Sequence, residues 1–60
     1  MKSMELNYGD MVKVIKGKYK NQTGEYDNDF DNTRAVIMSP EIGEMIVPFY
    51  SLELLPPRTP

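Results

Sequence analysis

The chain has 60 residues, 40% of them hydrophobic, a net charge of −2, and neither histidine nor cysteine. A chain of this length forms one small domain with a modest core, and without cysteine it has no disulfide or thiolate metal site to stabilise it. The usual general base, the thiolate nucleophile and the commonest metal ligand are also missing, so the sequence predicts a protein that is not an enzyme and has no cofactor.

The charge is unevenly distributed along the chain. Residues 2–20 hold five lysines and two acidic residues, whereas residues 25–53 hold seven acidic residues and one arginine. A protein that wraps nucleic acid is basic throughout, so this distribution allows only a local basic patch. The start of the chain lacks the apolar core of a targeting segment, and no apolar run approaches the roughly 18 residues that span a membrane. We therefore expect a cytoplasmic protein with no membrane contact.

The first predicted strand covers residues 11–15. Val12 and Val14 alternate with polar or flanking residues, and this period of two places both valines on one face. The following stretch is basic, has few apolar residues and lies between Gly17 and Gly24, which is typical of a loop. Gly24 suits a bulge, a positive φ angle or the close approach of another backbone.

A second strand is predicted from Gly24 to about residue 30. Tyr26 and Phe30 fall on one face of this strand, and Asp29 falls on the other face with its acidic neighbours. We expect Tyr26 to point into the core.

A hairpin turn is predicted at residues 31–32, where Asp and Asn both tolerate the positive φ angles of a two-residue turn. In this register, Asp29 lies opposite Arg34 as an ion pair. The same register places Tyr26 opposite Ile37 as an aromatic–aliphatic core pair, which supports the assignment.

The rest of the chain predicts short strands and turns. In order, the expected elements are a strand at residues 33–38, a turn at 39–43, a strand at 44–47, a 3-10 turn at 48–51, a closing strand at 52–55 and a stiff proline-rich tail at 56–60. Val36 and Met38 are both apolar, which leaves open whether the third strand is covered on both faces.

The stretch from residue 9 to residue 26 resembles the KOW motif: a Gly-Asp before a Val-x-Val strand, a glycine, a short basic loop, and a second glycine that opens a new strand. The matching residues are Gly9, Asp10, Val12, Val14, Ile15, Gly17, Lys18, Lys20 and Gly24. The later Val-Pro-x-x-x-Leu-Glu at residues 47–53 resembles the last turn and strand of many SH3-like barrels. The resemblance implies an all-β, five-stranded SH3-like small barrel over residues 1–55. In that family, found in ribosomal large-subunit and NusG-type proteins, the loops touch RNA or other proteins.

The leading functional hypothesis is a small KOW-like binding module that contacts RNA, DNA or a nucleoprotein machine. The candidate phosphate contacts are Lys13, Lys16, Lys18, Lys20 and Arg34. Tyr19, between two of the loop lysines, is the candidate for stacking on an unpaired base. The competing interpretation is that these lysines only keep an edge strand soluble.

A protein-binding adaptor is the alternative from another class, because SH3-like barrels also serve as small docking components of larger complexes, such as photosystem I and ferredoxin–thioredoxin reductase. The acidic run at residues 25–31 would meet a basic protein partner through Asp27, Asp29 and Asp31, and Tyr50 would anchor in it. A third option is an inhibitor whose acidic residues imitate a nucleic-acid backbone.

A metal site is not predicted at the acidic run. Asp27, Asp29 and Asp31 imitate the start of a calcium loop, but its sixth position should be Gly and is Asn32, and its twelfth should be Glu and is Met38. We interpret these carboxylates as a solvated strand face followed by a turn.

Overall fold

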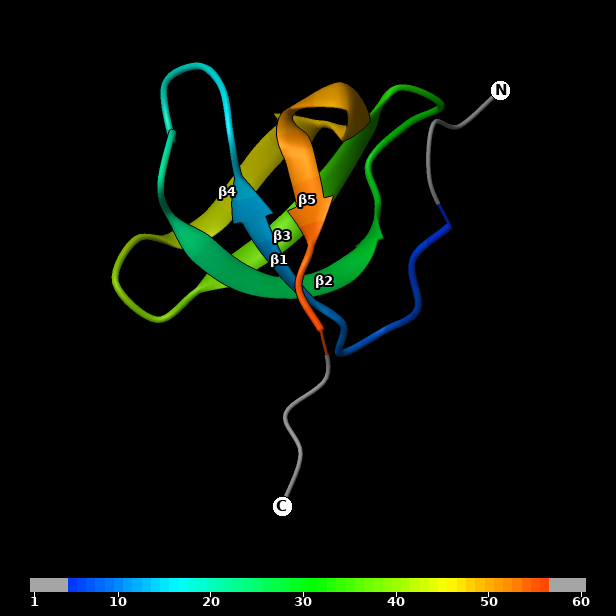
Figure 1. Cartoon of the computed structure of the whole chain (residues 1–60). Helices are drawn as coiled ribbons and strands as arrows, with labels where there is room; N and C mark the ends of the chain where they lie inside the picture. Colours follow the sequence, from blue (N-terminus) through cyan, green and yellow to red (C-terminus); the bar gives the residue numbers. More distant parts are fainter. Residues whose placement is uncertain (1–4, 57–60) are drawn as a thin grey trace.

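The computed structural model describes residues 5–56, which form five antiparallel strands and one short 3-10 helix (Figure 1). The elements are β1 (Met11–Val14), β2 (Thr23–Asp29), β3 (Arg34–Ser39), β4 (Gly43–Pro48), η1 (Phe49–Ser51) and β5 (Leu52–Leu54). The all-β prediction is confirmed, with five strands and a 3-10 turn before the last. Of the tail expected at residues 56–60, all but Pro56 lies outside the described residues. Within residues 5–56, no helix is long and apolar enough to cross a membrane.

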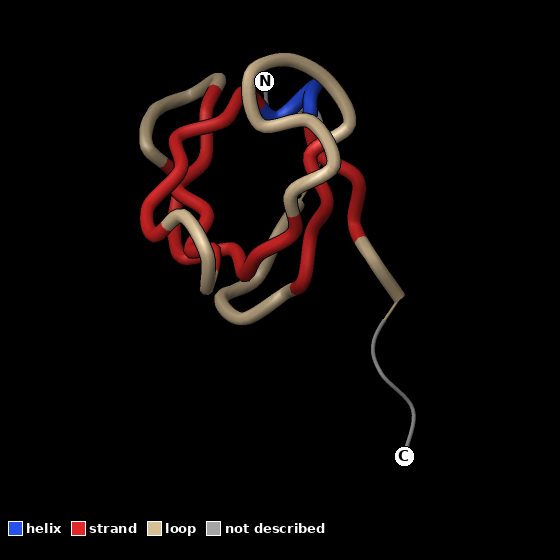
Figure 2. Tube along the Cα trace, turned by 90° about the vertical axis from the view of Figure 1, so that its left-hand side faces the viewer, coloured by secondary structure: helices blue, strands red, loops and turns tan. Residues whose placement is uncertain are grey.

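The five strands form one sheet in the order β4-β3-β2-β1-β5. The strands surround a common interior (Figure 2), but the ladders described for residues 5–56 leave β4 and β5 as the two edges. The η1 turn joins the end of β4 to the start of β5 along the chain, and its backbone hydrogen bonds extend the β3–β4 and β1–β5 pairings by one step each. The Phe49 amide donates to the Thr33 carbonyl beside β3 (2.9 Å), and the Ser51 carbonyl accepts from Ile15 beyond β1 (2.7 Å).

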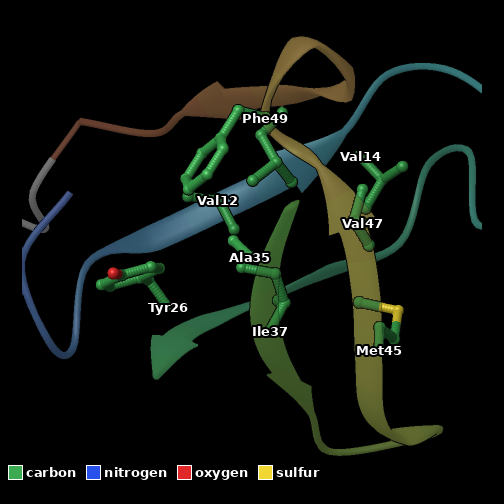
Figure 3. Packing of buried hydrophobic residues seen from close by; sticks show 9 residues of the cluster. Val12, Val14, Tyr26, Ala35, Ile37, Met45, Val47 and Phe49 are labelled. Atoms are coloured by element: carbon green, nitrogen blue, oxygen red, sulfur yellow. The ribbon is translucent and has the colours of Figure 1, made fainter. Parts of the chain in front are cut away.

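The core fills the concave side of the sheet. Side chains from different strands and from η1 point toward this common interior (Figure 3). The buried cluster consists of Val12, Val14, Tyr26, Ala35, Ile37, Met45, Val47, Phe49 and Leu52. Burying a Val, Leu, Ile, Phe or Met side chain stabilises the fold by about 1.5–3 kcal/mol. The inward placement predicted for both valines and for Tyr26 is confirmed.

At Gly24, β2 lies against the backbone of β3 with no room for a side chain. A Cβ atom at this position would lie 2.6 Å from the Met38 carbonyl oxygen and 2.8 Å from the Ile37 Cγ2. Of the three roles expected for this glycine, the structure selects the approach of another backbone. No side chain fits there unless the two strands separate.

The β2–β3 hairpin has a different register from the predicted one. Tyr26 pairs with Ile37 as expected, but the register shifts by one residue at Asp27, and Asp29 pairs with Ala35 instead of Arg34. A bulge adds one residue to one strand, so the side chains beyond it change faces. Phe30 is consequently 50% exposed and does not share the inward face of Tyr26.

The hairpin connection is also longer than the predicted two-residue turn. β2 ends at Asp29 and β3 begins at Arg34, so residues 30–33 connect the strands, and the amide of Phe30 donates to the carbonyl of Arg34 (2.9 Å). On the following strand Val36 is buried, whereas Met38 is 43% exposed. On the outer face of β3, Val36 is therefore shielded from solvent and Met38 is not, so the strand is covered on both faces only at Val36.

Candidate functional site

The loop between β1 and β2 is ordered by its own backbone. Gly17 and Asn21 adopt positive φ angles of 86° and 76°, a conformation that glycine and asparagine reach most readily. The amide of Lys20 donates to the carbonyl of Gly17 (3.1 Å), and the amide of Asn21 donates to that of Val14 (2.7 Å). The loop is thus a fixed turn that presents its lysines to solvent.

This loop forms one wall of a hollow of about 420 Å³, whose other wall is the end of β4 and η1. We call this hollow the loop groove. It lies beside β4, one edge of the sheet. Its lining residues are Val14, Lys16, Gly17, Lys18, Tyr19, Ile46, Val47, Pro48, Tyr50 and Ser51. None of these described residues carries a carboxylate, so the charged side chains that line the groove are cationic.

Two tyrosines line the loop groove, and they have different roles. Tyr19 is half-buried and packs against the hydrophobic core, so it covers part of the core beneath the β1–β2 loop. Tyr50 is 66% exposed. The ammonium of Lys16 lies 5.6 Å from the centre of the Tyr50 ring, and that of Lys18 lies 5.4 Å from the centre of the Tyr19 ring. Each pair has cation–π geometry, which fixes a positive charge beside an aromatic face.

The structure brings together only part of the predicted nucleic-acid set. Lys16, Lys18 and Tyr19 line the loop groove, and Lys20 is exposed on the same loop. Lys13 is half-buried on β1 opposite Thr23 and Glu53, and it is not among the lining residues.

Arg34 does not join this set because Asp31 holds its guanidinium. The Arg34 side chain donates from Nε (3.0 Å) and Nη2 (2.6 Å) to one Asp31 oxygen, and its guanidinium lies 4.8 Å from the Phe30 ring centre. The other Asp31 oxygen accepts from the amides of Thr33 (2.9 Å) and Arg34 (2.8 Å). The hydrogen bonds from Arg34, and then those from Thr33, lower the pKa of Asp31 to about 2. The two charges therefore neutralise each other within the turn.

The acidic run does not present four equivalent carboxylates. The Tyr26 hydroxyl donates to Asp29 (2.5 Å), a contact that the bulge at Asp27 makes possible by turning Asp29 toward the face of Tyr26. Burial, followed by this hydrogen bond and the nearby negative charges, raises the pKa of Tyr26 to about 12. Asp31 forms an ion pair with Arg34.

No group of three or more potential metal-ligating side chains is found among residues 5–56.

Sequence reasoning missed that Tyr50 belongs with the lysine loop. It assigned this tyrosine to the acidic adaptor surface, although η1 places the ring beside Lys16. The available signal was the pair Phe49-Tyr50 after Pro48: when Phe49 enters the core, its neighbour points outward. The contribution of Ile46 to the groove had no counterpart in the sequence patterns.

Comparisons with known proteins add no family to this description. No protein-family model matches the chain, and no curated protein matches it significantly.

Proposed function

We propose that this chain is an SH3-like small barrel of the KOW type that binds single-stranded RNA or DNA, alone or within a nucleoprotein complex. We place it in the cytoplasm and assign it no catalytic step. The sequential order of strands β1 to β4, with β5 added beside β1, supports the barrel, as does the short η1 turn through which the chain passes from one edge strand, β4, to the other, β5. The KOW-like residues Gly17 and Lys18 line the loop groove, and Gly24 lies where β2 packs against the backbone of β3.

The observation that carries the proposal is the grouping of an exposed aromatic ring with lysines in one hollow without carboxylates. Proteins that bind single strands combine a positive groove for phosphates with aromatic rings on which bases stack. Tyr50 supplies the exposed ring, Lys16 stands over it, and Lys18 extends the positive wall. Stacking requires an unpaired base, so the groove favours single strands over duplexes.

The adaptor alternative has weaker support. Two of its carboxylates, Asp29 and Asp31, already accept hydrogen bonds inside the hairpin, and its aromatic anchor, Tyr50, lines the basic groove. The acidic mimic of a nucleic-acid backbone depends on the same carboxylates. Neither alternative explains why cations and aromatic rings converge on one hollow.

The lysine contribution is tested by the salt dependence of binding. We expect a labelled oligouridylate of about ten nucleotides to bind at low salt, a length within the site sizes of small single-strand binders. Contacts from Lys16, Lys18 and Lys20 to three phosphates give a slope of about −2 in a plot of log affinity against log salt. Lys18→Ala with Lys20→Ala should reduce the slope to about −0.7.

Lys13→Ala is the matched control, because Lys13 lies on β1, away from both the β1–β2 loop and the groove lining, and its removal should leave the slope unchanged. The proposal fails if no oligonucleotide binds at low salt. It also fails if the double variant and the control have the same slope.

The aromatic contribution is tested separately at Tyr50. Stacking on an aromatic ring contributes about 1–3 kcal/mol per base, so Tyr50→Ala should weaken binding roughly 5- to 150-fold. Tyr50→Phe keeps the ring and should bind nearly as well as the wild type. Equal affinities for the alanine and phenylalanine variants would exclude a stacking role.

A further inference from the structure

A second surface lies on the outer face of the sheet, where methionine and glutamate alternate across four strands. Met11 on β1 pairs with Glu25 on β2, Glu25 pairs with Met38 on β3, and Met38 pairs with Glu44 on β4. We call these four residues the Met–Glu row. It crosses the sheet through the neighbouring strands β1, β2, β3 and β4 (Figure 1).

Three residues of the row, Met11, Glu25 and Met38, line a hollow of about 350 Å³. Its lining residues are Met11, Gly24, Glu25, Met38, Ser39 and Pro40. Met11 is 41% exposed and Met38 is 43% exposed, so both methionines offer apolar surface to water. This lining shares no residue with the loop groove.

The chemistry of the row is that of an adaptable protein-binding surface with a negative charge. Methionine side chains are flexible and polarisable, and they are over-used where a surface must fit irregular partners. Glu25 and Glu44 alternate with the methionines, and Glu41 is exposed in the turn that follows Pro40. The cation on the outer face of β1 is Lys13, which lies opposite Glu53.

From this pattern we infer that the Met–Glu row docks a basic peptide segment of a protein partner, with an apolar side chain of that segment seated between Met11 and Met38. Electrostatic complementarity selects the partner, because lysine or arginine beside the apolar anchor meets Glu25 and Glu44. A nucleic-acid strand would be repelled by the same glutamates. A symmetric contact with a second copy would place the glutamates of both copies in one desolvated interface, which is costly.

This inference does not rest on the nucleic-acid groove, because the two surfaces have separate linings. A partner on the Met–Glu row leaves the loop groove open, so one chain can hold a basic protein segment and a single strand at the same time. The chain would then act as a connector between the two.

The probe is a fluorescein-labelled amphipathic peptide of leucine and lysine, with leucines at i, i+3, i+4 and i+7 so that they lie on one helical face. The comparison peptide has serine in place of every leucine and keeps the charge. Fluorescence anisotropy against the full chain should give saturable binding for the leucine peptide, at least tenfold tighter than for the serine peptide.

The variants separate the two components of recognition. Met11→Gln with Met38→Gln should weaken binding of the leucine peptide at least tenfold. Glu25→Gln with Glu44→Gln should also weaken it and flatten its salt dependence. Ile42→Gln, which changes an exposed apolar residue outside the hollow, and Glu53→Gln, which removes an acid on β5, are the matched controls and should bind as the wild type does.

Three results would overturn the inference. The first is equal affinity for the leucine and serine peptides. The second is unchanged binding in both double variants while their melting temperatures match the wild type. The third is a concentration-dependent dimer, detected by light scattering and abolished by the methionine variant, which would assign the row to a second copy.

Discussion

At the residue scale, Tyr26 joins the core of this molecule to its polar hairpin. Its ring is buried among core side chains from β1, β3 and η1, and its hydroxyl donates a 2.5 Å hydrogen bond to Asp29. Burial and the adjacent carboxylate both disfavour the phenolate, so the pKa of Tyr26 rises to about 12 from an ordinary value of 10. The folded state therefore holds this proton more tightly than the unfolded chain.

The first prediction concerns alkaline stability. A raised pKa contributes stability that is fully present below pH 10 and is lost as the pH rises from 10 to about 12. Tyr26→Phe should cost about 1 kcal/mol near pH 7 through the lost hydrogen bond, and its stability should decline less steeply above pH 10. Urea unfolding at several pH values measures both effects. Tyr50→Phe is the control and should decline as the wild type does; an equally steep decline in Tyr26→Phe would contradict the assignment.

The second prediction concerns Gly24, where β2 meets the backbone of β3. In Gly24→Ala the new Cβ would lie 2.6 Å from the Met38 carbonyl oxygen, so the strands must move apart. We expect a loss near the upper end of the cost of overpacking, about 3 kcal/mol, and a fall in melting temperature of roughly 10–20 °C. Gly17→Ala, where nothing lies within 4 Å but φ is 86°, should cost only about 1–2 kcal/mol. A Gly24→Ala melting temperature within a few degrees of wild type would contradict this account.

At the scale of the element, the β2–β3 turn is organised by one carboxylate. Asp31 accepts hydrogen bonds from Thr33 and from both the backbone and the side chain of Arg34, which lowers its pKa to about 2 from 3.8. A lowered pKa contributes stability that is present above about pH 4 and is lost as the pH falls toward 2.

The third prediction is that the wild type and Asp31→Asn converge in acid. The asparagine keeps the turn acceptor but loses the ion pair with Arg34, so the variant should melt below the wild type at pH 7. Below pH 4 the difference in melting temperature should shrink, and it should vanish only below pH 2, where the carboxyl is protonated in the folded state as well. A difference that stays constant from pH 7 to pH 2 would show that the ionised carboxylate is not responsible.

Strand β1 and the β2–β3 hairpin show what sequence reasoning reaches and what it does not. Val12 and Val14 were placed correctly because only one face of β1 is buried, and a period of two then fixes the orientation. The polar run before residue 31 has no such constraint, since a one-residue shift there leaves polar side chains in water in either register. The bulge at Asp27 was therefore not predictable, and the ion-pair partner of Arg34 was assigned to Asp29 instead of Asp31.

The candidate site was half predictable for a different reason. The lysines of the β1–β2 loop lie close together in the sequence, so the sequence alone showed that they form one basic cluster. Tyr50 is about thirty residues away, and its position beside Lys16 depends on how η1 connects the two edges of the sheet. Local patterns carry no information on such a contact.

At the scale of the whole molecule, two surfaces of opposite character share one small sheet. The loop groove carries lysines and tyrosines, and the Met–Glu row carries glutamates and methionines. The two linings have no residue in common, so the proposed nucleic acid and the proposed basic peptide would bind at separate hollows. The net charge of −2 does not reveal this separation, because lysines line one hollow and a glutamate lines the other.

The most direct test of the central claim is a map of backbone amide chemical shifts in isotope-labelled protein, titrated with oligouridylate at low salt. We expect the largest shifts at Lys16, Lys18 and Tyr50, with smaller shifts across the rest of the loop and little change at Met11 and Met38. The absence of shifts, or their concentration on the Met–Glu row, would contradict binding in the loop groove.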